Sequence, residues 1–374
     1  MKRLFLGLMC ICFLQVAYGQ AKKIDDVIPV RGLAIAAPSV QGLDLFLKFI
    51  EEELAPAHFN MLVLRVDWNY AYESHPELRR DDPLSRADVK RIVDLCKKYD
   101  IKIAPQINLL GHQGGARPLN LLRVYPEFEE SPHITEAPSN TYVDGLYQRS
   151  YCPLHPEVHN VVFALVDELM DVFEAEWFHA GMDEVYHLGD ERCPRCRGLD
   201  KADLFAGEVT RIHNHLAIKN RRLMIWGARL IDGISAGVGA WEGSYNNTYR
   251  AIDMIPKDVY ICDWHYNRAD LTNVYFAIKG FDVVSCPWNR PEVAAKQLED
   301  MINFRQQSSR AMAPRFQGLL ATVWSGADGF LRSYYDPETY VVQPPVEGEQ
   351  NNQTRGGDAR TVKLLIEEFK QLNQ

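Results

Sequence analysis

The stretch Phe178-His179-Ala180-Gly181-Met182-Asp183-Glu184-Val185 decides how the rest of the chain is interpreted. Its apolar residues predict a short buried strand that ends in two adjacent carboxylates. Charged side chains are rarely buried unless they are paired, so this pair is either the start of a solvated loop or part of a site. A bare Asp-Glu dipeptide favours the loop. The apolar strand, with a His and a Gly at fixed distances before the acids, favours the site.

The first nineteen residues have the features of a secretory signal peptide. Lys2 and Arg3 precede an apolar run over residues 4–16, and Ala17-Tyr18-Gly19 offers small residues for cleavage. We therefore expect residues 1–19 to be removed and residues 20–374 to form an exported protein, periplasmic or extracellular, with no stable membrane insertion. The apolar run is short for a bilayer span, and an uncleaved membrane anchor is the alternative.

The composition limits the classes of partner. The chain has 374 residues, is 47% hydrophobic and carries a formal net charge of −9. Loss of the two cationic residues of the signal would make this charge −11. An acidic protein repels nucleic acids and anionic membrane surfaces, so neither is expected as a partner.

Six cysteines remain after cleavage of the signal, and two of them form the motif Cys193-Pro194-Arg195-Cys196. A zinc site would need two more ligands at matching spacing, and the sequence shows none nearby. In an exported protein we expect a local disulfide between Cys193 and Cys196, with a reduced pair as the alternative. The other four are expected to be small buried hydrophobes: Cys96, Cys152, Cys262 and Cys286.

Strand-like and helical patterns alternate along the mature chain. Strands are predicted at residues 32–37, 60–66, 101–107, the central stretch, 223–226, 259–264, 281–288 and 319–324. Helices are predicted at residues 43–54, after a cap at Ser85, and at 158–173, 202–218, 274–279, 293–304 and 362–372. Eight strands that alternate with helices predict a single α/β domain, a (β/α)8 TIM barrel. A doubly wound sheet is the alternative, but no glycine-rich phosphate loop follows the first strand.

Long irregular stretches follow the third and the eighth predicted strands, at residues 113–156 and 326–357. Loops of this length are uncommon unless they are functional. Because the active sites of such barrels lie at the carboxyl ends of the strands, these loops are expected to shape the rim of a site or an interface.

Tryptophan is the residue that collects at those strand ends. Five indoles each end a predicted strand: Trp68, Trp226, Trp264, Trp288 and Trp324. Trp241 lies in a loop on the same side, whereas Trp177 begins its strand and is expected to pack in the core. A single Trp is ordinarily a packing residue, but five at corresponding positions predict a pocket that stacks against sugar rings.

Two histidines and one tyrosine join this group. His112 ends the third predicted strand, His179 lies in the fourth, and Tyr266 follows the sixth. No set of three metal ligands can be assembled from the spacing, so no metal and no cofactor are expected. We expect the histidines to hydrogen-bond the carboxylates.

Adjacent carboxylates suggest a division of labour. Neighbouring residues of a strand point to opposite faces, so Asp183 and Glu184 converge only where the strand turns into a loop. Conventional glycosidases place two carboxylates across the scissile bond. Neighbouring ones suit a different scheme, in which one protonates the leaving oxygen and the other holds a group of the substrate. A like-charged neighbour also raises the pKa of the acid.

The segment His179-Ala180-Gly181-Met182-Asp183-Glu184 resembles the His-x-Gly-x-Asp-Glu signature of family 20 glycoside hydrolases, the β-N-acetylhexosaminidases. The longer stretch 179–189, with Cys193 and Cys196, is more similar to the hexosaminidase D branch, as is the segment 106–112 that ends in Gly-His. The resemblance covers residues 31–326.

The resemblance implies exo-acting, retaining hydrolysis of terminal β-linked N-acetylglucosamine or N-acetylgalactosamine from glycans or glycoconjugates. The acetamido oxygen of the sugar would attack its own anomeric carbon. Glu184 would be the acid/base, Asp183 would orient the acetamido group, and Tyr266 would bind its carbonyl side. The other substrate-binding candidates are His112, His179, Trp226, Trp264, Trp288 and Trp324.

The sequence also departs from the family pattern. The first strand lacks the sugar-binding Arg of the larger members, no Glu follows Trp324 by two residues, and Gly227-Ala228-Arg229 replaces acids after Trp226. Position 182 is Met where Gly is common. These changes concern the recognition of sugar hydroxyls. Possible substitutes, each also explicable as a member of a structural ion pair, are Arg65, Asp67 and Arg229.

Three rival functions stay open: a non-catalytic carbohydrate-binding barrel, a glycosidase of a different amino-sugar linkage, and a metal-dependent hydrolase. The presence of both Asp183 and Glu184 argues against the first. The oligomeric state is not indicated. Two glycosylation sequons, at residues 246–248 and 352–354, matter only in a host that glycosylates.

Overall fold

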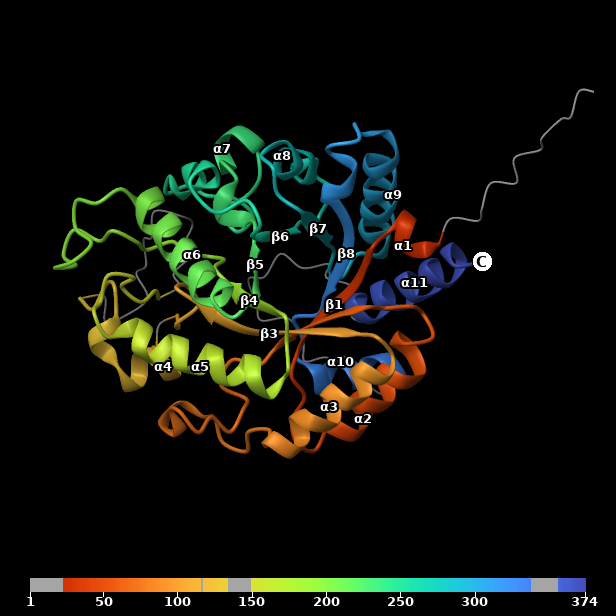
Figure 1. Cartoon of the computed structure of the whole chain (residues 1–374), viewed down its shortest axis with the longest axis horizontal. Helices are drawn as coiled ribbons and strands as arrows, with labels where there is room; N and C mark the ends of the chain where they lie inside the picture. Colours follow the sequence, from red (N-terminus) through yellow and green to blue (C-terminus); the bar gives the residue numbers. More distant parts are fainter. Residues whose placement is uncertain (1–22, 116, 134–148, 338–355) are drawn as a thin grey trace, which may run out of the picture.

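The computed structural model describes residues 23–115, 117–133, 149–337 and 356–374. Its eight strands are parallel and close into one barrel in chain order, with β8 paired to β1 (Figure 1). The strands are β1 (Val30–Ala36), β2 (Met61–Arg65), β3 (Lys102–Leu109), β4 (Trp177–Gly181), β5 (Arg222–Trp226), β6 (Tyr260–Trp264), β7 (Val283–Cys286) and β8 (Phe316–Thr322). The predicted (β/α)8 barrel is confirmed.

Helices surround this barrel (Figure 1). They are α1 (Ile24–Val27), α2 (Leu43–Phe49), α3 (Arg86–Lys98), α4 (Asn120–Val124), α5 (Val158–Val172), α6 (Lys201–Ala217), α7 (Gly233–Ala236), α8 (Thr272–Ile278), α9 (Pro291–Gln307), α10 (Ala327–Tyr335) and α11 (Gly357–Leu372). The N-terminal ends of two of these helices follow from local chemistry. Ser85 and Asp88 form a reciprocal capping box at α3, and Pro291, which needs no N–H partner, occupies the first turn of α9.

Two apolar layers hold the fold together because each strand is buried on both faces. In β2, Met61 and Val63 belong to the cluster inside the barrel, whereas Leu62 and Leu64 belong to the layer beneath the helices. Trp177 lies inside the barrel, edge-on to Tyr260, which agrees with its predicted packing role. The filled interior makes the barrel a rigid base for residues at the strand ends.

The structure corrects two predicted elements. The central strand, β4, ends at Gly181, so Met182 to Val185 lie beyond it rather than in it. The irregular stretch after the eighth strand begins with a helix, α10, whose apolar side is buried at Phe330, Leu331 and Tyr334. The helix was not predicted because it is short and directly follows Gly326.

Several expectations fall partly or wholly outside the described residues. These are the signal peptide at residues 1–19, the sequon at 352–354, and residues 134–148 and 338–355 of the two long stretches. Within the part of the chain that the structure describes, no helix combines the length and apolar character needed to cross a membrane.

Candidate active site

The two central carboxylates project from a sharply turned segment at the end of β4. Gly181, Met182 and Glu184 all have left-handed backbone conformations, with φ of 69°, 69° and 50°. In a regular strand, neighbouring side chains would point to opposite faces. These successive left-handed residues end that pattern and bring the carboxylates of Asp183 and Glu184 to one side. Left-handed conformations at Met and Glu cost free energy, and such strain is typical of functional sites.

Gly181 is required by the close approach of β3. A Cβ at this position would lie 2.3 Å from Oδ1 of Asn108 and 3.0 Å from its Cα. We expect Gly181→Ala to lower the free energy of unfolding by roughly 1–3 kcal/mol, from strain and overpacking together. Urea denaturation measures this loss.

Gly207→Ala is the matched control, because a Cβ there in α6 meets nothing within 4 Å. This control should raise the free energy of unfolding by about 0.5–1 kcal/mol, since alanine favours a helix. Equal effects of the two substitutions would contradict the assigned role of Gly181.

His112, just after β3, connects the two carboxylates. Its Nε2 lies 3.0 Å from Oδ2 of Asp183 and 3.1 Å from Oε2 of Glu184. His112 itself has a left-handed backbone, with φ of 56°, which turns the ring toward them. One N–H group is thus shared by both acids.

The pKa directions separate the roles of the acids. Burial raises the pKa of Glu184, the negative charge of Asp183 adds to this, and contacts with His112 reduce the shift without cancelling it. Burial also acts to raise the pKa of Asp183, but the charge and hydrogen bond of His112 outweigh it and lower that pKa. Burial lowers the pKa of His112, yet the two carboxylates bring it well above its ordinary value. The arrangement therefore makes Glu184 the weaker acid of the pair and Asp183 the stronger one.

Some buried polar atoms at this end of the barrel have no hydrogen-bond partner among the residues that the structure describes. Oδ1 of Asp183 is an acceptor without a donor, and Nε1 of Trp226 and Nε1 of Trp288 are donors without acceptors. Unpaired buried polar groups are costly. Each of these atoms retains the capacity for a further hydrogen bond.

Aromatic rings line the same end of the barrel. Nε1 of Trp324 donates to the hydroxyl oxygen of Tyr266 at 2.8 Å. Tyr266 stacks on Trp264, with ring centroids 4.9 Å apart, and meets Trp288 edge-on at 5.3 Å. Trp226 contacts Trp324 at 5.6 Å. Burial raises the pKa of Tyr266, and the charge of Asp183 contributes to this increase, which places the phenol within its electrostatic range.

Two residues that the sequence assigned to the site, His179 and Trp68, do not take their predicted places. His179 does not bond the carboxylates as expected: it is fully buried beneath them, where its Nδ1 accepts from the N–H of Gly181 and its ring packs on Trp226. Trp68 packs against the apolar layer under the helices and not among the indoles of the barrel end. Trp241 is 44% exposed and meets Tyr186 at 6.1 Å.

The three residues considered as substitutes for missing sugar ligands have different surroundings. Arg229 is buried and donates to the carbonyls of Ala240 and Trp241, so it holds a loop. Arg65 lies over the ring of Trp324 at 4.8 Å, and its Nε is 4.0 Å from Oδ2 of Asp67. Arg65 and Asp67 retain some exposure at this end of the barrel, so they are the better placed pair.

Sequence reasoning missed two supports of the site. His265 lies 2.5 Å from Glu242 and 3.2 Å from Asp263, which anchors the chain next to Tyr266. Burial lowers the pKa of His265, but the acids raise it to about 10. Asn246 is buried and donates from Nδ2 to the carbonyl oxygens of Val185 at 2.8 Å and Tyr186 at 3.1 Å. It thereby fixes the segment directly after Glu184.

The local disulfide predicted between Cys193 and Cys196 is absent, because both are free thiols in the described chain. Each instead approaches Cys152, at 3.1 Å for Cys196 and 3.6 Å for Cys193. The spacing of the motif could not reveal a third thiol that is brought in from another loop.

Two groups of three side chains at this end of the barrel have the donor atoms to hold a cation. The donor atoms of His112, Asp183 and Glu184 lie within 4.8 Å of one another, as do those of Glu242, His265 and Asp270. The first group is a ligand set that the sequence did not reveal. Its hydrogen bonds through one histidine nitrogen account for the same geometry without a metal.

Paired carboxylates beside indole rings, at the carboxyl end of a parallel barrel, are characteristic of glycosidases. The family model described as "Glycosyl hydrolase family 20, catalytic domain" matches residues 67–326, more than half of the chain. The chain belongs to this family.

Individual relatives are distant. A beta-hexosaminidase of Akkermansia muciniphila is 28% identical over 190 residues, which are 45% of this chain and 37% of that protein. Hexosaminidase D of Bos taurus is 25% identical over 138 residues, 36% of this chain and 35% of that protein. The matches thus span little more than a third of these curated relatives.

Solved structures share the fold. The chitobiase of Flavobacterium johnsoniae aligns with a TM-score of 0.60 at 18% identity, covering 91% of this chain and 52% of that chain. The beta-N-acetylhexosaminidase of Bacteroides fragilis aligns with a TM-score of 0.57 at 16% identity, covering 92% and 72%.

Proposed function

We propose that this protein is an exo-acting β-N-acetylhexosaminidase that removes terminal N-acetylglucosamine or N-acetylgalactosamine from glycans by substrate-assisted, retaining catalysis. Membership of family 20 supports the class of reaction. The paired carboxylates and the indoles at one end of the barrel support the assignment of the site.

The observation that carries the proposal is the state of Asp183. One of its oxygens is held by His112, while the other, Oδ1, is buried without a donor. The low pKa of Asp183 keeps it an anion. An acetamido N–H is the donor that would satisfy Oδ1, and a fixed anion at that nitrogen stabilises the positive charge that develops as the acetamido oxygen attacks C1.

Glu184 performs the proton transfers in this proposal. Burial raises the pKa of Glu184, which favours the protonated carboxyl that a general acid requires over a wider range of pH than an ordinary glutamate has. Glu184 gives its proton to the glycosidic oxygen while the acetamido oxygen forms a bond to C1 and the C1–O bond breaks. It then removes a proton from the water that opens the cyclic intermediate, which restores the sugar with its configuration retained.

The remaining side chains position the sugar. Tyr266, held by Trp324, donates its hydroxyl to the acetamido oxygen, and the indoles of Trp226, Trp264 and Trp324 pack on the apolar faces of the ring. Arg65 and Asp67 take the hydroxyl-binding role of the family ligands that this sequence lacks. Trp288 offers an unpaired N–H to the same sugar.

The test is hydrolysis of three chromogenic glycosides: the β-N-acetylglucosaminide, the β-N-acetylgalactosaminide, and the β-glucoside that lacks the acetamido group. We expect turnover of one or both of the first two and none of the third, because the nucleophile belongs to the substrate. The ratio of the first two gives the hydroxyl preference.

Turnover of the plain glucoside at a comparable rate would overturn the substrate-assisted mechanism. No turnover of any of the three by a folded protein would favour a carbohydrate-binding barrel or another amino-sugar linkage. Loss of activity to a chelator, with restoration by a metal, would favour a metal-dependent hydrolase.

We also propose that the protein acts outside the cytoplasm. The charged start, apolar run and small residues of positions 1–19 support export and cleavage before Gln20. Amino-terminal sequencing of the native protein tests this proposal, and a protein that begins at Met1 would contradict it.

A further inference from the structure

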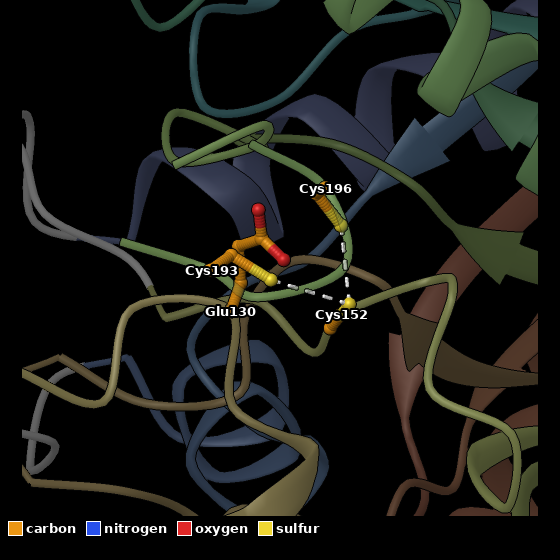
Figure 2. A group of neighbouring side chains, drawn as sticks. All are labelled: Glu130, Cys152, Cys193 and Cys196. Atoms are coloured by element: carbon orange, nitrogen blue, oxygen red, sulfur yellow. Dashed lines mark hydrogen bonds between the residues drawn. The ribbon is translucent and has the colours of Figure 1, made fainter. Parts of the chain in front are cut away.

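Away from the active site, three cysteines and one glutamate meet in the loops after β3 and β4. Figure 2 shows Cys152, Cys193, Cys196 and Glu130 gathered with their sulfur and oxygen atoms toward one another. One donor atom from each lies within 4.8 Å of all the others, and all four side chains are buried. We call these four residues the thiol cluster.

The backbone brings the thiol cluster together from two directions. An isolated antiparallel bridge between Glu129 and Tyr151 sets Glu130 beside Cys152, and the N–H of Glu130 bonds the carbonyl of Ser150 at 3.0 Å. Cys193 and Cys196 lie on one tight turn, where the N–H of Arg197 bonds the carbonyl of Cys193 at 3.2 Å. The cluster therefore does not depend on long or mobile side chains.

Glu130 is the member that ordinary packing does not explain. Its side chain has no exposed surface. Oε1 accepts the N–H of Asp190 at 2.9 Å, whereas the buried Oε2 has no hydrogen-bond partner in the described part of the chain. A buried carboxylate oxygen with no donor is costly unless it binds a cation.

We propose that the thiol cluster is a structural zinc site, with Cys152, Cys193, Cys196 and Glu130 as its four ligands. Zinc in structural sites takes four ligands in a tetrahedron and accepts thiolate sulfur and carboxylate oxygen. Zinc–sulfur bonds of about 2.3 Å place two thiolates roughly 3.8 Å apart. The sulfurs here are separated by 3.1 and 3.6 Å, so binding needs only a small expansion.

A disulfide is the alternative to a metal for these thiols, but it would leave donor atoms of the cluster without a partner. Its sulfurs would have to approach to about 2.05 Å. Three thiols also leave one unpaired after any disulfide forms, and Oε2 of Glu130 would remain without a partner. One zinc ion uses all four donors at once.

The proposed metal joins the two loops that carry the active site. Glu130 and Cys152 belong to the connection after β3, which also carries His112, and Cys193 and Cys196 follow Asp183 and Glu184 after β4. The N–H of Tyr151 bonds the carbonyl of Leu110, two residues before His112. The four ligands leave no open position, so the metal has a structural and not a catalytic role.

The first experiment measures metal and thiols in the same sample of the full chain, purified without chelator. We expect one zinc per chain by elemental analysis, and a full count of free thiols after denaturation in the presence of chelator. Zinc below one tenth of an equivalent, or two thiols fewer than the purified chain contains (six without residues 1–19, eight with them), would overturn the proposal in favour of empty thiols or a disulfide.

Cobalt(II) supplies an independent readout on folded, metal-depleted wild-type protein. We expect an intense thiolate-to-cobalt charge-transfer band that saturates at one equivalent and disappears when zinc is added. A cobalt spectrum without this band would overturn the assignment of the three thiols as ligands.

Variants then assign the ligands. Cys152→Ala and Cys196→Ala should lose the zinc and lower the midpoint of thermal unfolding, and Glu130→Gln should weaken zinc binding at least tenfold. The matched control is Cys96→Ala, a buried free cysteine of α3 far along the chain from the cluster, which should keep one zinc. Full zinc content in Cys152→Ala would contradict the proposal, whatever the hydrolytic activity of the protein.

Discussion

Glu184→Gln is expected to lower kcat/KM toward an N-acetylglucosamine disaccharide by about 10²–10⁴-fold, the range for the loss of a general acid. The amide fills nearly the same volume and can still accept the hydrogen bond from His112, so the free energy of unfolding should change little. Steady-state kinetics and urea denaturation of the same preparation measure the two quantities.

The chemistry of the leaving group distinguishes an acid from a merely structural residue. A strongly acidic phenol leaves as its phenolate and needs no proton from an acid. Glu184→Gln should therefore lower kcat/KM for an aryl glycoside with such a leaving group far less than for the disaccharide. An equal loss on both substrates would refute the acid role.

The pH profile of kcat/KM gives a second readout. Because the pKa of Glu184 is raised and its protonated form is the active one, activity should persist above the ordinary glutamate range and then fall on the alkaline side. This alkaline limb should disappear in the variant. Glu191→Gln, an exposed glutamate of the same loop, is the matched control and should retain normal kinetics.

Asp183→Asn is expected to lower kcat by about 10²–10³-fold, with a smaller change in KM, since it removes a charge that stabilises the transition state more than the bound substrate. The variant also removes the anion that balances His112. The acid limb of the pH profile, which reports ionisation of Asp183, should vanish with it.

Substrates with altered N-acyl groups test the link to the acetamido group. Fluorine on the acyl group makes its oxygen a weaker nucleophile, so activity should fall along a fluoroacetyl series. This dependence should become steeper in Asp183→Asn, because the anion no longer supports the developing charge. An unchanged dependence would contradict the assigned role, and Asp203→Asn, exposed in α6, is the control.

The barrel could be predicted because its signals are local. Eight apolar runs, each followed by a helical pattern, determine the alternation, and the carboxyl ends of parallel strands always meet at one face. That rule alone predicted that Trp226, Trp264, Trp288 and Trp324 lie at one end of the barrel, and the structure joins their rings in one connected group with Tyr266. The same rule failed for Trp68, which lies beyond the end of β2 and packs against the outer layer.

Contacts between distant segments could not be predicted. The N–H of His112 reaches both carboxylates only because β3 and β4 are neighbours and both end in left-handed turns. His179 precedes the acids in the sequence motif, yet its position in the strand directs it into the barrel beneath them. Cys152 joins Cys193 and Cys196 through an antiparallel bridge that no spacing rule describes.

The position of Asn246 has a consequence for the choice of expression host. It is the acceptor asparagine of a sequon, yet its amide is buried and both of its hydrogen bonds hold the segment after Glu184. A eukaryotic secretory pathway attaches its glycan to an unfolded chain, before that burial can protect the nitrogen. The bulky sugar would then occupy the place of the Val185 and Tyr186 carbonyls, so a yeast or mammalian secretion system should yield misfolded material where a bacterium does not.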